Sequence, residues 1–416
     1  MDVRSYSLVT AAYWAFTLTD GALRMLVLLH FHDLGYSSLD LAFLFLLYEF
    51  FGILTNLFGG WIGSRLGLRV TLFAGLAIQI VALAMLSAVS AEWVRWLSVA
   101  YVMSAQALSG IAKDLTKMSS KSAIKLVVAS DNQSALFKWV ALLTGSKNAL
   151  KGVGFFLGGL LLSALGFQGS LWAMAAALCV VLLSSVLTLA HDIGKSKEKV
   201  KFSQLFSKSR EINVLSLARL FLFASRDVWF VVGLPVFLYE SLHWTFTGIG
   251  GFLAAWVIGY GCVQAVVPRF VSKTAALAEI VHAARVWGFV LAAISAAIAL
   301  AVQYDFHPAL AVLGGLALFA VAFAVNSSVH SYLILAFTDS DKVALNVGFY
   351  YMANAIGRLT GTLLSGLVFM WFGLSGCLWV STVLVVLAAT LTLFLHIRQS
   401  TAHRDDAYLD IACESA

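Results

Sequence analysis

Apolar segments long enough to cross a lipid bilayer recur along almost the whole chain. About 20 apolar residues are needed to span the hydrocarbon core. Twelve such segments are expected, at 8–31, 38–63, 69–90, 97–127, 137–165, 169–190, 213–239, 246–268, 276–302, 308–336, 343–372 and 375–397. Only 12% of the residues are charged, whereas soluble domains contain about 25%. The pattern therefore predicts an all-α polytopic membrane protein and excludes water-soluble fold classes.

One long polar stretch, HDIGKSKEKVKFSQLFSKSRE, separates the sixth segment from the seventh. It divides the twelve segments into two groups of six. The expected organisation is an N-terminal six-helix half at 1–190, a cytoplasmic linker at 191–212, a C-terminal six-helix half at 213–397 and a cytoplasmic tail at 398–416.

Basic residues accumulate on one side of the expected membrane. They are Arg4, Arg65, Arg69, the 195–210 cluster, Arg269, Lys273, Lys342, Arg398 and Arg404, and the opposite loops contain only Arg95. The positive-inside rule then places both termini in the cytoplasm. The N-terminal residues lack the cationic region and cleavage site of a signal peptide, so the first segment should remain as an anchor. The predicted location is the cell inner membrane.

A shift of 207 residues brings similar residues of the two halves into register. Asp20 falls on Asp227, Gly52 on Gly259, Trp172 on Trp379, Gly154, Gly159 and Gly166 on Gly361, Gly366 and Gly373, Lys151 on Arg358, and Lys147 on Asn354. A constant register over separate segments indicates two halves related by a parallel repeat. Major facilitator transporters are built in this way, with a substrate site near the membrane midplane between the halves. The twelve-helix major facilitator fold around a central cavity is therefore the expected fold.

The sequence after the second segment, GWIGSRLGLR at 60–69, resembles the gating motif of major facilitator proteins. Gly60, Arg65, Gly67 and Arg69 match that motif. Ser64 stands where the motif has an acidic residue, so the usual inter-helix salt bridge lacks its carboxylate. The segment GVGFFLGG at 152–159 resembles the glycine-rich motif of the fifth helix without its proline. Close packing of helices also explains these glycines.

Charged residues lie inside several of the apolar segments. The deep positive set is Arg24, Lys113, Lys117, Lys147, Lys151, Arg226 and Arg358, and the deep negative set is Asp20, Glu49, Asp114 and Asp227. Seven positive charges minus four negative charges leave +3. Buried charge without a partner is costly, so mutual pairing cannot satisfy the whole set. Arginine and lysine bind oxyanions well. The surplus predicts a carrier for a small organic polyanion.

Two simpler interpretations stay open. Asp20 and Arg24 stand four residues apart on one helical face and can neutralise each other as an i,i+4 pair. Hydropathy alone ends the fourth segment near Ala112, in which case Lys113 and Lys117 belong to an amphipathic extension at the cytoplasmic face. The repeat register instead places these lysines near the middle of the membrane.

Other chemistry has little support in the sequence. His30 and His32 alone are a weak metal pattern, and the four cysteines are scattered. No catalytic serine, histidine and aspartate pattern is present. We therefore expect no enzyme activity, no metal or cofactor and no binding of nucleic acid. The fold usually acts as a monomer, with the lipid bilayer as its surroundings.

The stretches TDGALRMLVLLHFHDLGYSSLDLAFLFLLYEFFGILTNLFGGWIG at 19–63 and SGIAKDLTKMSSKSAIK at 109–125 resemble the ArsJ organoarsenical efflux permeases, a branch of the major facilitator superfamily. The resemblance implies export of 1-arseno-3-phosphoglycerate. Glyceraldehyde-3-phosphate dehydrogenase makes this ester when it uses arsenate in place of phosphate, which implies a functional link to that enzyme. The exported ester falls apart outside the cell, so export amounts to arsenate resistance.

The residues then take the following expected roles. Arg24, Lys113, Lys117, Lys147 and Lys151 bind one oxyanion of the substrate, and Arg226 and Arg358 bind the other. Asn354 is a further substrate-binding candidate. Asp20, Glu49 or Asp227 carries the proton of an antiport cycle. A phosphate or sugar-phosphate antiporter, another major facilitator exporter of drugs or metabolites, and a non-transporting membrane receptor are the alternatives.

Overall fold

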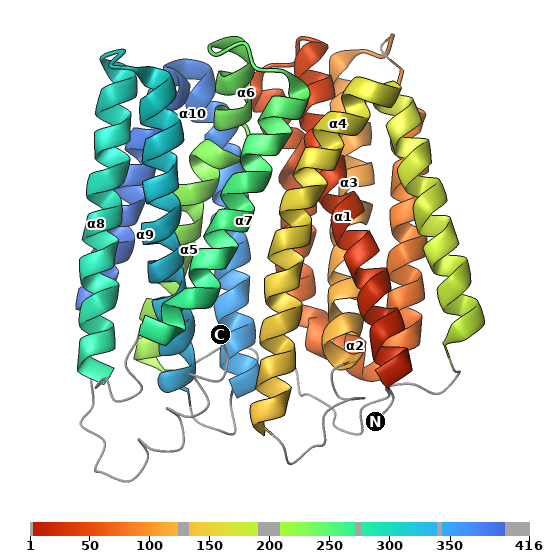
Figure 1. Ribbon diagram of the computed structural model, residues 1–416, viewed down its shortest axis with the longest axis horizontal. Helices are drawn as coiled ribbons and strands as arrows, with labels where there is room; N and C mark the ends of the chain where they lie inside the picture. The colour runs from red at the N-terminus through yellow and green to blue at the C-terminus, as the bar shows by residue number, and fades with distance from the viewer. Residues whose placement is uncertain are drawn as a thin grey trace. The chain divides into compact units, whose positions relative to one another are not determined.

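The structure is a computed structural model that describes residues 3–90, 92–123, 133–189, 209–270, 277–338 and 343–395. This part of the chain is helical and contains no strand (Figure 1). Its helices are α1 (Val3–Asp33), α2 (Ser38–Ser87), α3 (Arg95–Ala123), α4 (Gln133–Thr188), α5 (Arg210–Phe230), α6 (Gly233–Glu240), α7 (Phe246–Phe270), α8 (Leu277–Gln303), α9 (Pro308–Ala336) and α10 (Val343–Leu393).

The chain forms two compact units. Unit 1 comprises Met1–Val200 together with Leu238–Ile258, and unit 2 comprises Lys201–Phe237 together with Gly259–Ala416. Unit 1 therefore includes the end of α6 and the first half of α7. Most of the predicted linker, residues 191–208, and the predicted tail lie outside the described residues. The predicted domain boundaries accordingly stay predictions.

Three helices are too long to cross a bilayer once. At about 1.5 Å per residue, the 50 residues of α2 would extend far beyond a hydrocarbon core of about 30 Å. Each of the three bends at one glycine with a positive φ, which is 76° at Gly67 in α2, 67° at Gly166 in α4 and 60° at Gly373 in α10. Glycine adopts this left-handed conformation without the steric cost that other residues meet. Figure 1 shows the two arms of α4 running in opposite directions from its bend.

Each bend falls between two of the expected segments. The bend at Gly67 separates 38–63 from 69–90, and Gly166 and Gly373 separate the pairs 137–165 and 169–190, and 343–372 and 375–397. Eight helical stretches among the described residues are long and apolar enough to cross a membrane. Helices α1 and α3 are not among them, because polar residues lower their hydropathy. The fold is the expected all-helical, multi-pass one, while the count of twelve crossings stays a prediction.

Helices α1 and α5 occupy the interior of their units. Between Asp20 and Leu29, every residue of α1 except Arg24 is buried, and the helix packs against α4, α3 and α2. Helix α5 packs against α10 and α9 in the same way. A helix that is apolar on all sides is expected in the interior of a bundle. These two helices carry Asp20 and Asp227, the pair that the repeat places in register.

The repeat is also visible in the packing of glycines. Gly154 of α4 lies where an added Cβ would come within 3.0 Å of Gly21 in α1. Its counterpart Gly361 of α10 lies where an added Cβ would come within 2.8 Å of the Asp227 side chain in α5. Both glycines therefore permit close contact with the interior helix of their own unit.

The second arm of α4 presents large apolar side chains outward. Val180, Leu183 and Leu187 are 67%, 62% and 84% exposed. Such a surface suits contact with lipid tails and would be unusual for a soluble monomer. The outward face of α4 therefore agrees with the membrane location.

The histidine pair at the end of α1 has two separate sets of partners. The His30 ring stacks on Phe167 with 3.9 Å between centroids. His32 Nε2 lies 3.5 Å from Glu240 Oε1. No group of three histidine, cysteine or acidic side chains is arranged for a metal ion in the described ranges.

Candidate functional site

A polar cluster lies where α1, α2 and α3 of unit 1 pack together. The Tyr48 hydroxyl of α2 donates a hydrogen bond of 2.7 Å to Asp20 Oδ1 of α1. Both side chains are buried. Gly110 allows this arrangement, because a Cβ there would lie 2.6 Å from the Tyr48 carbonyl oxygen. The glycine lets α3 approach the α2 backbone at the level of Tyr48.

The predicted pairing of Asp20 with Arg24 is wrong. Arg24 Nη1 instead lies 3.3 Å from Glu49 Oε1 of α2, and the Glu49 side chain is only 2% exposed. The long arginine side chain reaches across to the neighbouring helix, where a deeply buried carboxylate needs a cationic partner. Arg24 also lies over the Phe45 ring, 5.2 Å from its centroid. The charge pair therefore joins two helices and does not lie along one.

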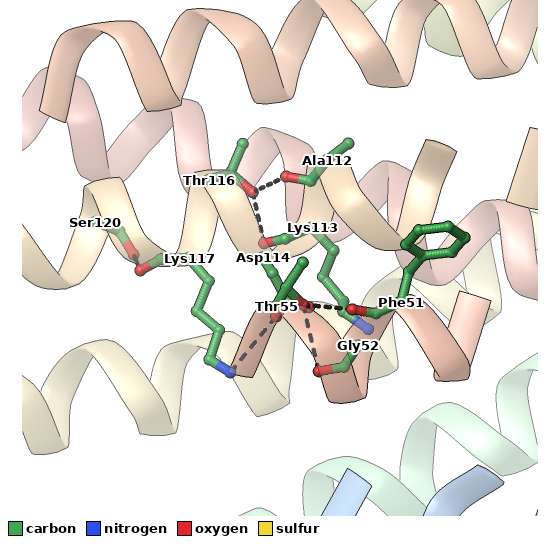
Figure 2. A network of polar contacts seen from close by, with 9 residues as sticks. All are labelled: Phe51, Gly52, Thr55, Ala112, Lys113, Asp114, Thr116, Lys117 and Ser120. Carbon is green, nitrogen blue, oxygen red and sulfur yellow. Dashed lines mark hydrogen bonds and ion pairs between the residues drawn. The ribbon is translucent and has the colours of Figure 1, made fainter. Parts of the chain in front are cut away.

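Helix α3 adds two lysines and a carboxylate to the cluster, as Figure 2 shows. Thr55 of α2 donates a hydrogen bond to Asp114 Oδ2, and Lys117 Nζ lies 3.6 Å from Asp114 Oδ1. Lys113 Nζ lies over the Tyr48 ring, 3.9 Å from its centroid. A Cβ at Gly52 would stand 3.6 Å from Lys113 Nζ. Gly52 therefore lies directly beside the lysine amine.

The polar end of α3 is folded against α2 and is not a solvated extension. The helix continues to Ala123, beyond the point near Ala112 where hydropathy would end it. Ser119 is fully buried, and its hydroxyl donates to the Leu115 carbonyl at 3.0 Å and lies 2.7 Å from the Thr71 hydroxyl of α2. Hydroxyls that bond to their own helix carry no unsatisfied group into an apolar environment.

Helix α4 brings Lys147 and Lys151 beside α1. The Trp14 indole N–H donates a 3.1 Å hydrogen bond to Ser146 Oγ, next to Lys147. At Gly21, an added Cβ would lie 2.8 Å from the Lys151 carbonyl oxygen. Both lysines are half-buried. The structure thus places Lys151 against the helix turn that carries Asp20.

Unit 2 has a smaller and more tightly paired cluster. Arg226 Nε donates a 2.6 Å hydrogen bond to Asp227 Oδ1, and Arg226 Nη2 lies 2.5 Å from the same oxygen. Arg358 Nε of α10 lies 3.5 Å from Asp227 Oδ2. Asn354, one turn before Arg358, is half-buried, and its Oδ1 accepts no hydrogen bond. Asp227 therefore holds two arginines from two helices.

The gating motif is described only in part. Gly67 forms the bend of α2. Arg69 lies over the Phe73 ring, 5.2 Å from its centroid, and its Nη2 lies 3.5 Å from the Val186 carbonyl oxygen of α4. Gly60 lies in α2, and the side chain of Arg65 falls outside the described set. The role of the motif in gating stays a prediction.

Tyr48 and Thr55 were not among the predicted site residues. Both face the same side of α2 as Gly52, at spacings of four and three residues, which is the spacing of one helical face. Gly52 was already marked by the repeat. Extending its face by one turn in each direction would have found both side chains.

The model of the Major Facilitator Superfamily matches residues 9–284. The chain belongs to this family. It is a multi-pass membrane transporter and not an enzyme. A search of curated proteins found no match to this sequence.

Solved transporters share the fold of this major facilitator protein. The human organic anion transporter MFSD10 (TETRAN) is 17% identical, with a TM-score of 0.62, 94% of this chain covered and 100% of the other. The nucleoside transporter NupG is 14% identical, with a TM-score of 0.70 and coverage of 94% and 98%. A bacterial homologue of the iron transporter ferroportin, in an inward-facing state, is 16% identical, with a TM-score of 0.67 and the same coverage. Identities this low establish the fold and leave the substrate open.

Proposed function

We propose that this transporter exports a small organic polyanion, namely 1-arseno-3-phosphoglycerate, by proton-coupled antiport, and so confers arsenate resistance. The observation that carries the proposal is the cluster in unit 1, where Lys113 and Lys117 of α3 flank the buried Asp114 and Arg24 is paired with Glu49. Cationic groups in the interior of apolar helices usually mark a substrate or ion pathway.

Charge counted within each unit supports a polyanion. Unit 1 holds five of the candidate cations against Asp20, Glu49 and Asp114, and five minus three leaves +2. Unit 2 holds Arg226 and Arg358 against Asp227, and two minus one leaves +1. An anionic substrate would lower the electrostatic cost of both surpluses. Neutral or cationic substrates would bring no negative charge to either cluster.

The two clusters suit two different oxyanion groups. In unit 2, the guanidinium groups of Arg226 and Arg358 offer planar donor pairs that match a phosphate or arsenate. In unit 1, Lys113 and Lys117 offer compact ammonium charges, with Arg24 and the α4 lysines nearby. The ArsJ resemblance implies an ester with phosphate at one end and arsenate at the other, and each cluster offers donors suited to one such group.

Asp20 is the carboxylate best suited to carry the coupled proton. Glu49, Asp114 and Asp227 each have a basic side chain within ion-pair distance. In the described part of the chain Asp20 has no such pair, and its hydrogen bond comes from the neutral Tyr48 hydroxyl. Protonating Asp20 therefore strands no buried cation. Protonating any of the other three would leave a cation without its partner, at a cost of several kcal/mol.

Tyr48 connects this carboxylate to the substrate-binding lysine. Its hydroxyl contacts Asp20, and its ring faces the amine of Lys113. Arg24 follows Asp20 by one turn on α1, and the backbone of Lys151 in α4 lies against the adjacent Gly21. An oxyanion that draws Lys113 away from the ring would change the field at Asp20. Substrate binding and proton exchange would then be coupled through one side chain.

Arsenate resistance in a sensitive host tests the substrate. The transporter should protect cells only together with glyceraldehyde-3-phosphate dehydrogenase, because that enzyme makes the ester. Lys113→Ala, Lys151→Ala and Arg358→Ala should each abolish protection while the folded protein remains in the membrane. Arg95→Ala, at the exposed first residue of α3, is the matched control. Full protection by all three variants would contradict the assignment of the site.

Vesicle transport tests the coupling. Uptake into inverted vesicles should depend on a pH gradient in the native protein and lose that dependence in Asp20→Asn. Dependence that survives in Asp20→Asn and disappears in Glu49→Gln would move the role to Glu49. Competition by inorganic phosphate or a sugar phosphate, with no arsenate resistance, would favour the phosphate antiporter. Orientation with both termini in the cytoplasm of the inner membrane and a monomeric state are part of the proposal.

A further inference from the structure

A buried arginine in unit 2 lies apart from the proposed substrate cluster. Arg219 of α5 is 3% exposed and precedes Asp227 by eight residues, which is about 12 Å along the helix. Its Nη1 donates to both the carbonyl oxygen and Oγ of Ser327 in α9, each at 3.0 Å. These hydrogen bonds join α5 to α9 at a position along α5 that is separate from the Asp227 cluster.

No carboxylate forms an ion pair with Arg219 within the described ranges. The other contacts of its guanidinium are the ring faces of Phe223 and Tyr350, at 4.1 and 5.0 Å from their centroids. Aromatic faces and serine oxygens offset part of the cost of burying a permanent charge. The net charge of the pocket nevertheless remains +1, because arginine does not deprotonate in proteins. An anion is the missing partner.

Polar atoms around Arg219 lack the hydrogen bonds expected of buried groups. Arg219 Nε, Ser216 Oγ and His330 Nδ1 are all buried without a partner. Ser216 lies one turn before Arg219 on α5, and His330 lies one turn after Ser327 on α9. Residues at this spacing share a helix face. More than nine-tenths of buried polar groups in proteins are bonded, so three such atoms at one level of two packed helices indicate a bound species.

We propose that Arg219, Ser216 and His330 bind a small inorganic anion such as chloride. All three can donate a hydrogen bond, His330 in the tautomer with its proton on Nδ1. The surroundings select a small ion: Ser216, Ser327 and His330 are at most 2% exposed. On one side an apolar cluster that includes Ile212, Leu215 and Leu333 closes the site. An organic polyanion does not fit there without opening the contact between α5 and α9.

Direct binding to the full-length native protein tests the site. Purified transporter in detergent should bind radiolabelled chloride saturably, at one ion per chain. Its thermal unfolding midpoint should rise with chloride at constant ionic strength set by potassium gluconate, because a ligand that binds only the folded state stabilises it. Equal unfolding midpoints in chloride and gluconate, or absence of saturable binding, would overturn the proposal.

Variants then assign the ion to these residues. Arg219→Met should abolish binding and the chloride effect on the unfolding midpoint, whereas Arg219→Lys, which keeps the charge, should weaken binding about tenfold. Ser216→Ala removes one hydrogen-bond donor from the buried site and leaves the rest of it unchanged, so chloride binding should weaken severalfold. It also serves if Arg219→Met does not fold. Unchanged affinity in both Arg219 variants and in Ser216→Ala would refute the assignment, and Arg95→Gln is the control that should behave as the native protein.

The substrate cluster and this site can be separated. Arg358→Ala should lose arsenate resistance and keep chloride binding, since Arg358 forms its ion pair with Asp227 and is not among the proposed chloride ligands. Loss of chloride binding in Arg358→Ala would mean that the ion occupies the substrate cluster and would overturn a separate site. Chloride binding without any arsenate resistance in the native protein would refute the proposed function and leave the anion site standing.

Discussion

Asp20 and Asp227 occupy equivalent places in the repeat, yet their surroundings differ in charge. Asp227 receives two arginines, Arg226 from its own helix and Arg358 from α10. Asp20 receives the hydroxyl of Tyr48, while the nearest arginine on its helix, Arg24, is paired with Glu49. Both halves of the repeat therefore have a buried carboxylate at this position, but the groups that bind it differ. Asp227 joins two helices through its arginines, whereas Asp20, bonded to a neutral hydroxyl, is the carboxylate to which we assign the coupled proton.

Removing each carboxylate should separate these two roles, with the largest effect in unit 2. Asp227→Asn leaves two arginines facing a neutral amide, so the loss of stability should be on the order of 3 kcal/mol. Asp20→Asn keeps an oxygen for the Tyr48 hydroxyl and should cost much less. Thermal unfolding of the purified proteins in detergent measures both. Equal destabilisation by the two changes would contradict the comparison, and Asp227→Glu should restore most of the loss.

The Arg24–Glu49 pair should behave like the Asp227 cluster and unlike Asp20. A double-mutant cycle with Arg24→Gln and Glu49→Gln should give a coupling energy of about 2 kcal/mol, because each single change strands a buried charge. The matched cycle with Asp20→Asn and Arg24→Gln should give a value near zero. A larger coupling energy of Arg24 with Asp20 than with Glu49 would support the pairing along α1 and contradict the pairing between helices.

Tyr48→Phe should remove the hydrogen bond to Asp20 and keep the ring contact with Lys113. The variant removes the hydroxyl and keeps the aromatic ring that faces the lysine amine. Loss of one hydrogen bond to a buried carboxylate costs about 1–2 kcal/mol. The pH dependence of transport should shift while the apparent affinity for substrate stays close to native. Tyr48→Leu, which also removes the ring, should weaken substrate binding; identical behaviour of the two variants would argue against a link through the ring.

The bends offer the smallest test, because both units should respond alike. Gly166→Ala and Gly373→Ala force a side chain into the left-handed region at positions where a Cβ meets no other atom. The cost is therefore conformational, about 1 kcal/mol each. The thermal unfolding midpoint should fall by the same amount in the two variants. A clearly larger loss of thermal stability in one variant would show that its glycine has a role beyond forming the bend.

Hydropathy and the positions of glycine predicted much of the fold. The expected breaks at 63–69, 165–169 and 372–375 surround the three bends. They could be foreseen because spans of fixed length must end, and glycine alone turns a helix in one residue. The end of α3 was the uncertain case, because the residues after Ala112 are polar by composition, yet Asp114 and Ser119 are buried and contact α2. Hydropathy averages over the faces of a helix and does not show which face has a partner.

The sequence was sufficient to predict which charged residues belong to the unit 1 cluster, but not which of them contact each other. The repeat register marked Asp20, and helical spacing marked Arg24, but a flexible arginine can reach a neighbouring helix as easily as its own turn. The Glu49 contact depends on the packing of α2 against α1, which the residue spacing within α1 does not reveal. The anion site at Arg219 was equally hidden, since its partners come from α9, more than a hundred residues later.

The bends of α2, α4 and α10 also set how the chain tolerates insertion. A turn made by one residue has no slack between its two arms. Each residue added beside Gly166 would rotate the second arm of α4 by about 100° about its axis. Val180, Leu183 and Leu187 would then turn from the lipid side toward the interior of unit 1. Length at these three positions should be as constrained as residue identity, in contrast to the longer connections between the other helices.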